Sequence, residues 1–319
     1  MAADVGHLAR AAGLLATALA ATVALSGCGS GSSENTGPIA FSATPPGARN
    51  PSLYVVDPDG GPPRRLAGRP GDSDPSWSPD GTRVAFRRWA PAGCPRPHRD
   101  CAQIVVTNAD GRNARPVTLA RHNSLQPDWS PDGRKLAFAR WQDDANPFAN
   151  SADIYVVNAD GTGLRLLTHG PGDEASPAWS PDGTRIAFTS TRGGNQDVYV
   201  MRADGSDVRN LTRTGTPEYA PAWSPDGERI AFQDGDGALV VAKADGTGLE
   251  TLTRSFAGDG QPTWSPDGKR IGFLRHGVSG DALYVMTDDG AEPRRLEIGE
   301  VDRPSDPDWA PASAGSRDG

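Results

Sequence analysis

The sequence predicts an all-β fold, a six-bladed β-propeller of four-stranded antiparallel blades that is closed by pairing of its N- and C-terminal segments. Three observations predict it. One repeat recurs along the chain, each copy holds four short apolar segments separated by turn residues, and the two ends of the chain carry complementary parts of one copy. The composition agrees, because 39 Gly and 29 Pro in 319 residues favour short strands and turns over long helices.

The first strand of each repeat ends in a tryptophan that is followed by a tight turn. In Ser-Pro-Asp-Gly the proline presets φ, Asp suits the next position and Gly supplies the open conformation after it, which is a type I turn with a bulge. Five copies read Trp-Ser-Pro-Asp-Gly and a sixth is degenerate; they begin at Trp77, Trp129, Trp179, Trp223, Trp264 and Trp309. The turn therefore predicts where a first strand gives way to a second.

The second strand is a small apolar triplet that ends in phenylalanine, about nine residues beyond the tryptophan of each full motif. A copy at Ile39-Ala40-Phe41 has no tryptophan in front of it. The six phenylalanines are Phe41, Phe86, Phe138, Phe188, Phe232 and Phe273.

The third strand is a denser apolar run that an acidic residue and glycine close. In Val198-Tyr199-Val200-Met201, for example, there is no clean alternation, as expected for strands that are covered on both faces. The Asp-Gly turn that follows is a hairpin signal, and a short fourth strand such as Asn210-Leu211-Thr212 completes the repeat.

The two ends of the chain predict how the ring closes. Residues 38–70 hold the second, third and fourth strands of a repeat without a first strand, whereas Ser305–Trp309 hold a first strand with nothing after it. Together they make one blade, which leaves no open sheet edge and brings the count to six.

This pattern resembles the repeats of the TolB-type propeller, also called the WD40-like PD40 repeat. Residues 177–200 carry it nearly intact, from Pro-Ala-Trp-Ser-Pro-Asp-Gly through Ile-Ala-Phe to Asp-Val-Tyr-Val, and the resemblance covers residues 38–309. It implies the fold, whereas propellers of this kind serve as partner-binding platforms, as substrate filters on peptidases and as parts of sensors. TolB proteins carry an α/β domain ahead of the propeller, where this chain is expected to have a signal and a tether.

The N-terminal residues predict export. The apolar stretch from Ala11 to Leu25 is too short for a comfortable membrane span and reads as a signal peptide. Its end, Leu25-Ser26-Gly27-Cys28, resembles a lipobox, so Cys28 is expected to be lipidated; ordinary secretion is the alternative. The expected segments are a signal peptide (1–27), a Gly/Ser-rich tether (28–37), the propeller (38–309) and a flexible C-terminal tail (310–319), lipid-anchored to the cell membrane outside the cytoplasm.

Two further cysteines, Cys94 and Cys101, are separated by six residues. Outside the cytoplasm they are expected to form a disulfide. A metal site that uses His98 between them is the alternative, and it lacks a second ligand pair at suitable spacing.

Binding is expected on the rim opposite the tight turns, because the loops between second and third strands vary most in length there. Trp89, Trp141 and His276 each lie three residues beyond a second-strand phenylalanine and should emerge on this rim. The candidates for partner binding are Trp89, Trp141, Arg88, Arg140, Phe148 and His276, with Arg87 beside them. The alternative is that each tryptophan covers its own blade.

Four acidic residues stand three positions before the proline of a first strand: Asp72, Glu174, Glu218 and Asp259. If the first strands line the channel, these carboxylates ring its mouth and could hold a cation or a basic segment of a partner. The alternative is that they are ordinary exposed loop acids.

The charge pattern excludes a nucleic-acid surface, because 32 Lys plus Arg and 40 Asp plus Glu alternate along the chain and leave a net charge of −8. There is no Gly-x-Ser-x-Gly motif, and the histidines are scattered. The sequence thus predicts a monomeric, non-enzymatic platform for a protein, peptide or glycan, with no cofactor and no metal. The alternative is a propeller enzyme or cation-binding protein that uses the carboxylate ring.

Overall fold

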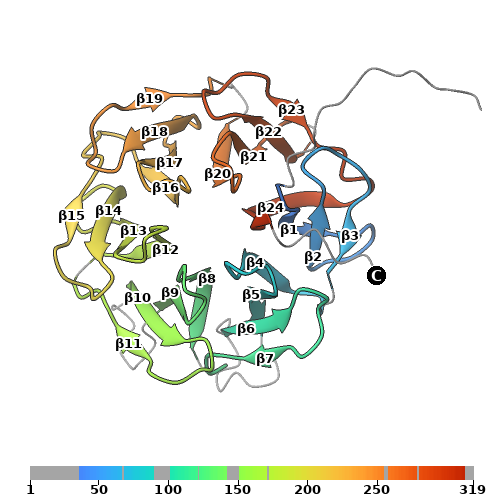
Figure 1. Cartoon of the computed structure of the whole chain (residues 1–319), viewed down its shortest axis with the longest axis horizontal. Helices are drawn as coiled ribbons and strands as arrows, with labels where there is room; N and C mark the ends of the chain where they lie inside the picture. The colour runs from blue at the N-terminus through green and yellow to red at the C-terminus, as the bar shows by residue number, and fades with distance from the viewer. Residues whose placement is uncertain are drawn as a thin grey trace, which may run out of the picture. The chain divides into compact units, whose positions relative to one another are not determined.

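The computed structural model describes residues 36–66, 68–89, 101–120, 122–141, 151–170, 172–254, 258–278 and 280–312. These residues belong to a compact unit that spans Asn35–Gly319. Their regular structure consists of β-strands numbered β1 to β24, which form short antiparallel sheets around a central channel (Figure 1). In this part of the chain no helix is long and apolar enough to cross a membrane.

Four sheets are separate and four-stranded. The first contains β24 (Asp302–Trp309), β1 (Ile39–Thr44), β2 (Ser52–Val56) and β3 (Arg64–Arg65). Another contains β12 (Glu174–Trp179), β13 (Arg185–Ser190), β14 (Asp197–Arg202) and β15 (Arg209–Asn210). The remaining two contain β16 (Glu218–Trp223), β17 (Arg229–Asp234), β18 (Leu239–Lys243) and β19 (Glu250–Thr251), and β20 (Asp259–Trp264), β21 (Arg270–Arg275), β22 (Ala282–Thr287) and β23 (Arg294–Arg295).

The fifth sheet has eight strands, which corrects the expectation of six separate sheets. It contains β4 (Asp72–Trp77), β5 (Arg83–Trp89), β6 (Ala102–Asn108) and β7 (Arg115–Pro116), followed by β8 (Asn123–Trp129), β9 (Lys135–Trp141), β10 (Ala152–Asn158) and β11 (Arg165–Leu166). A parallel pair, Ala102 opposite Asn123, joins β6 to β8. The join arises because β8 begins one residue earlier in the repeat than β4 or β12 do.

The predicted closure is confirmed. Strand β24 pairs antiparallel with β1, with Trp309 opposite Ile39, although they are more than 260 residues apart in the sequence. The last innermost strand of the ring therefore comes from the C-terminal end of the chain, beside β1 in Figure 1. This pairing covers the inner edge of β1.

The core lies between successive blades, as expected for strands covered on both faces. Six clusters of buried side chains are found among the described residues. One of them packs Val198 and Val200 of β14 against Ile230 and Phe232 of β17. Burial explains why phenylalanine recurs in the second strands, because each of the six side chains is at most 1% exposed: Phe41, Phe86, Phe138, Phe188, Phe232 and Phe273.

Arginines at the start of second strands strengthen these contacts. The guanidinium of Arg185 lies 4.6 Å from the ring centroid of Trp223 in the next blade. Three other pairs repeat this cation–π contact: Arg83 with Trp129, Arg229 with Trp264, and Arg270 with Trp309.

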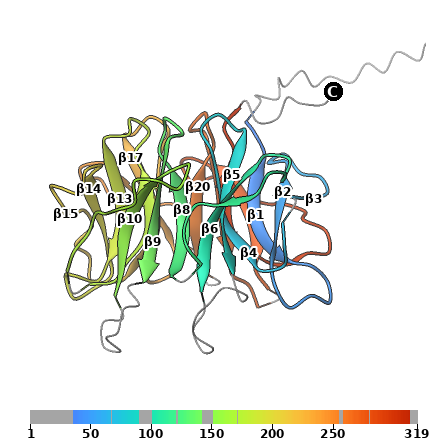
Figure 2. The same cartoon turned by 90° about the horizontal axis from the view of Figure 1, so that it is seen from below.

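Two kinds of turn define one rim of the ring, which we call the tight-turn rim: the Ser-Pro-Asp-Gly turns and the Asp-Gly turns. The opposite rim, which joins second to third strands, is the long-loop rim. Figure 2 shows the strands running between the two. In one turn Gly183 N–H donates to Ser180 O over 2.9 Å, and Gly183 has a φ of +69°. A Cβ on Gly183 would lie 3.1 Å from Cγ of Pro131 in the preceding turn, so glycine is needed for both φ and space.

A Gly183→Ala variant should therefore be destabilised by about 1–2 kcal/mol, because it combines a positive φ with a close contact. Urea denaturation followed by circular dichroism measures the change in the free energy of unfolding. Gly215→Ala is the matched control, since a Cβ at Gly215 meets no atom within 4 Å. Equal stabilities of the two variants would contradict the role given to the turn.

Candidate functional site: the central channel

Each innermost strand bends at one residue, three positions before its tryptophan. That residue has a positive φ although it is not glycine, and the pairing with the second strand shifts register there. The residues and their φ angles are Asp74 (52°), Gln126 (53°), Ser176 (50°), Ala220 (49°), Gln261 (52°) and Asp306 (53°). All six line the channel, so the bend is what brings these side chains to it.

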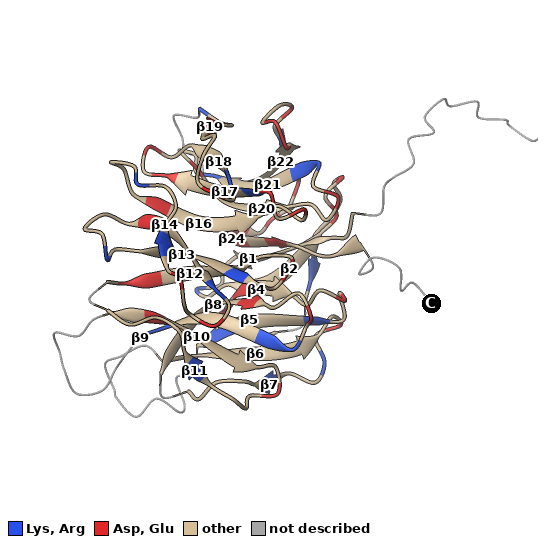
Figure 3. Cartoon of the chain, turned by 60° about the vertical axis from the view of Figure 1, so that its left-hand side comes forward, with Lys and Arg blue, Asp and Glu red and all other residues tan. Residues whose placement is uncertain are grey.

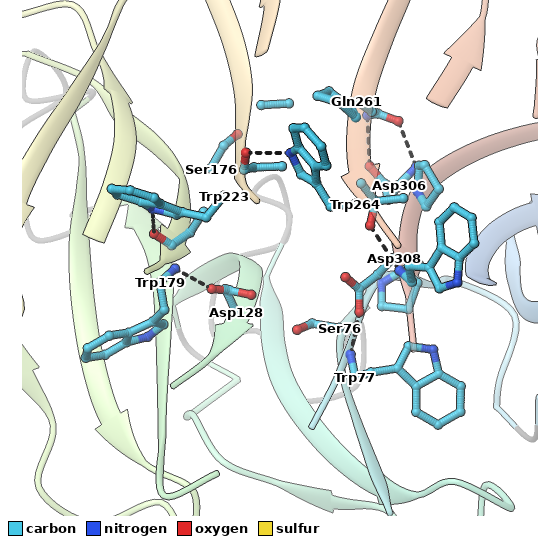
Figure 4. A pocket seen from close by; sticks show the side chains of 18 of the residues that line it. Ser76, Trp77, Asp128, Ser176, Trp179, Trp223, Gln261, Trp264, Asp306 and Asp308 are labelled. Carbon is cyan, nitrogen blue, oxygen red and sulfur yellow. Dashed lines mark hydrogen bonds between the residues drawn. The ribbon is translucent and has the colours of Figure 1, made fainter. Parts of the chain in front are cut away.

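The channel contains a cavity of about 480 Å³ (Figure 4). Its walls are the Pro-x-Trp ends of the innermost strands, together with Pro79, Pro225 and Pro266 of the Ser-Pro-Asp-Gly turns. The cavity therefore lies toward the tight-turn rim. The sequence predicts the binding face on the long-loop rim instead.

One side of the cavity is acidic. Asp74 of β4, Asp128 of β8, and Asp306 and Asp308 of β24 form what we call the acidic wall. In the part of the chain that the structure describes, the residues that line the cavity include no Lys, Arg or His. The opposite side is built of small residues: Ser176, Ala178, Ala220 and Ala222. The cavity is thus polarised, although Figure 3 shows acidic and basic residues interspersed over the strands and turns.

Side chains at the bend link several innermost strands to the backbone of the next. Gln126 N–H donates to Asp74 Oδ2 over 3.1 Å, and Ser176 N–H donates to Gln126 Oε1 over 2.9 Å. Asp306 N–H donates to Gln261 Oε1 over 2.7 Å. Ala220 has no polar side chain to continue the series, and the three bonds join β4 to β8, β8 to β12 and β20 to β24.

A second set of links lies at the position just before each tryptophan. Trp77 N–H donates to Asp308 Oδ2 and Trp179 N–H donates to Asp128 Oδ2, each over 2.6 Å. Figure 4 shows both bonds at the cavity. Asp128 and Asp308 therefore hold neighbouring blades together while they face the cavity.

Three carboxyl groups of the acidic wall bind protons more tightly than usual. Burial in the channel, together with the smaller effect of the nearby charge of Asp128, raises the pKa of Asp308 to about 8, against the lowering effect of the bond from Trp77 N–H. Burial likewise raises the pKa of Asp128 to about 7. The pKa of Asp74 is also raised to about 7, first by burial and then by the charge of Asp306, against the lowering effect of Arg87.

The four acids predicted at the channel mouth begin the innermost strands but are fully buried, which corrects the alternative that they are exposed loop acids. Asp72 binds Arg88 through two bonds of 2.8 Å, and Asp259 binds Arg275 over 2.7 and 2.9 Å. Glu174 binds Arg192 over 3.0 Å.

Glu218 accepts a bond of 2.8 Å from Thr212 Oγ1, where the other three accept bonds from an arginine. Burial raises the pKa of both Glu218 and Glu174. Among the described residues, no group of three or more His, Cys, Asp or Glu side chains could hold a metal ion. The structure thus brings each of the four to neighbours of its own rather than to one another.

The aromatic candidates lie at the long-loop rim. Trp89 ends β5 and Trp141 ends β9, both half-buried, and Arg87 lies 5.2 Å from the Trp89 ring centroid. Arg88 is engaged by Asp72, and Arg140 lies 5.0 Å from the ring centroid of Tyr155.

His276 Nδ1 lies 2.9 Å from an oxygen of Asp281. Phe148, Cys28 and Cys94 lie outside the described residues, as do residues 1–35 and 313–319. Cys101 is buried, at 7% exposure, and its pairing with Cys94 stays a prediction.

Sequence reasoning missed the acidic wall. The signal was present in the four residues that end each innermost strand, which read Asp-Pro-Ser-Trp, Gln-Pro-Asp-Trp and Asp-Pro-Asp-Trp on one side of the ring and Ser-Pro-Ala-Trp and Ala-Pro-Ala-Trp on the other. The acidic wall lies one position before and one position after the proline of these strands, whereas the acids singled out in the sequence lie three positions before it.

Comparisons with known proteins agree with this architecture. Residues 98–313 match the family model described as the TolB beta propeller domain. TolB from Acinetobacter baumannii is similar in structure, with a TM-score of 0.71 and 22% identity over 87% of this chain and 67% of that one. No match was found among the curated proteins.

Enzymes also share the fold. Hydrazine synthase from Kuenenia stuttgartiensis has a TM-score of 0.72 at 15% identity, over 88% of this chain and 47% of that one. A puromycin-hydrolyzing peptidase from Mycobacterium tuberculosis has a TM-score of 0.56 at 20% identity, over 78% of this chain and 42% of that one. These likenesses concern the fold, whereas the family model covers more than half of the sequence: the chain belongs to the TolB β-propeller domain family.

Proposed function

We propose that the protein is a non-enzymatic binding platform whose central cavity accepts a basic segment of a protein partner. The observation that carries this proposal is the acidic wall, four aspartates around a cavity of about 480 Å³ whose described lining residues include no basic side chain. A partner that supplies a Lys or Arg side chain would add positive charge to that of Arg87, which lies 3.3 Å from Asp74.

The geometry favours a side chain with a charged head and an apolar stem. Carboxylates in a narrow channel with low-dielectric walls focus their field on the interior, which strengthens attraction to a cation. The small side chains of Ala178 and Ala222 on the other wall leave room for the methylene groups of Lys or Arg. The cavity also falls within the volume range of pockets that enclose small ligands.

We also propose that the ring has six blades, with the eight-stranded sheet counted as two. The protein is a monomer outside the cytoplasm. It is anchored to the membrane by a lipid on Cys28, and a disulfide joins Cys94 to Cys101. The long-loop rim, with Trp89 and Trp141, offers a second docking surface.

Crosslinking capture from membranes, read by mass spectrometry, tests the cavity. The informative variant is Asp128→Asn/Asp308→Asn, because asparagine keeps a side-chain oxygen for the two backbone N–H groups and removes two charges. The matched control is Glu250→Gln/Glu297→Gln, which removes the same charge from exposed residues outside the cavity. A Trp89→Ala/Trp141→Ala variant reports on the long-loop rim.

We expect the wild type and the control to capture the same partner and the Asp128→Asn/Asp308→Asn variant to lose it. Circular dichroism establishes that each variant is folded. Loss only in the Trp89→Ala/Trp141→Ala variant would move the docking site to the long-loop rim, and equal capture by all the proteins would contradict a role for the cavity.

A further inference from the structure

We propose that protons and the basic partner compete for the acidic wall, so that mild acidification releases the partner without opening the ring. This inference rests on the proposed function of the cavity and adds its regulation. Two features support it. The carboxyl groups of the acidic wall repel one another, and they accept bonds from backbone N–H groups that link the blades.

The acidic wall brings like charges together. Asp74 of β4 faces Asp306 of β24, and Asp128 of β8 faces Asp308 of β24 closely enough that their charges repel. From β5, Arg87 reaches Asp74, with Nε 3.3 Å from Oδ2.

The other innermost strands, β12, β16 and β20, add only uncharged residues to the lining. A bound proton is one way to relieve the repulsion, and a bound cation is the other.

The contacts between blades do not need the charge. Asp308 and Asp128 accept the backbone N–H groups of Trp77 and Trp179, and Asp74 accepts that of Gln126. A carboxyl oxygen accepts such a bond in either protonation state. The wall can therefore lose its negative charge while the blades stay linked.

We expect a bound proton to be exchanged for a bound cation near neutral pH. Burial raises the pKa values of Asp74 and Asp128 to about 7 and that of Asp308 to about 8. Below these values the affinity for a cation falls by up to about tenfold per pH unit for each carboxyl that must ionise. We expect at least a tenfold loss of affinity between pH 8.5 and pH 6.

The protonation itself can be tested without any ligand. Carbon-13 NMR titration of the aspartate carboxyl carbons should show signals with midpoints near pH 7 to 8 in the full-length protein. Those of Asp128 and Asp308 are assigned by their disappearance in the Asp128→Asn and Asp308→Asn variants. If the signals of Asp74, Asp128 and Asp308 all have midpoints below pH 5, the inference is overturned while the proposed function stands.

Isothermal titration calorimetry with an acetylated and amidated tri-arginine peptide, which does not titrate in this range, tests the competition. We expect tighter binding at pH 8.5 than at pH 6 for the wild type and for Glu250→Gln/Glu297→Gln. Binding to Asp128→Asn/Asp308→Asn should be weak and less dependent on pH. Equal affinity at both pH values would contradict the inference alone, whereas no binding at any pH would contradict the proposed function as well.

Discussion

A Trp309→Ala variant is expected to lose about 3–5 kcal/mol of the free energy of unfolding, the range for removing a large buried aromatic side chain. Trp309 is 6% exposed and lies at the closure of the ring. Its indole Nε1–H donates to Thr36 O over 2.6 Å and to Gly37 O over 3.0 Å, and Arg270 lies 5.2 Å from its ring centroid. The substitution removes contacts to both ends of the chain at once.

Urea denaturation followed by far-UV circular dichroism measures this loss. Trp141→Ala is the matched control, because Trp141 is half-buried at the end of β9 and belongs to none of the core clusters of the described residues. We expect the control to lose less than half as much. If both variants lost the same free energy of unfolding, the prediction that the closure of the ring contributes more to stability than the end of β9 would be contradicted.

An Asp308→Asn variant is expected to be more stable than the wild type at pH 8.5, by a few kcal/mol at most. The folded-state pKa of about 8 lies above the ordinary aspartate pKa of 3.8, so between these values the folded protein keeps a proton that the unfolded chain releases. Stability therefore falls as the pH rises through this window, by up to about 1.4 kcal/mol per pH unit for each such group. Asparagine stays neutral and removes the contribution of Asp308.

Thermal unfolding between pH 5 and pH 8.5 measures the slope. The melting temperature of the wild type should fall across this range, and that of Asp308→Asn should fall less. Glu297→Gln, an exposed residue outside the cavity, should keep the slope of the wild type. Identical slopes for the wild type and Asp308→Asn would show that Asp308 is already ionised at neutral pH.

The sequence alone determined the architecture, because each local signal depends on neighbouring residues. The Ser-Pro-Asp-Gly turns, the phenylalanine triplets and the split blade at the two ends predicted strands, turns and closure, and β1 paired with β24 confirms the last of these. Such signals recur in every repeat, so an error in one copy is corrected by the others.

Only the tertiary structure decided the site. Asp74, Asp128 and Asp308 come from three different strands, β4, β8 and β24, and their proximity depends on the closure of the ring and on the bend in each innermost strand. Likewise Asp72 and Glu174 looked available in the sequence but are buried against Arg88 and Arg192. Burial and the approach of like charges are properties of the assembled ring, which is why the acidic wall and its raised pKa values could not be derived from residue order alone.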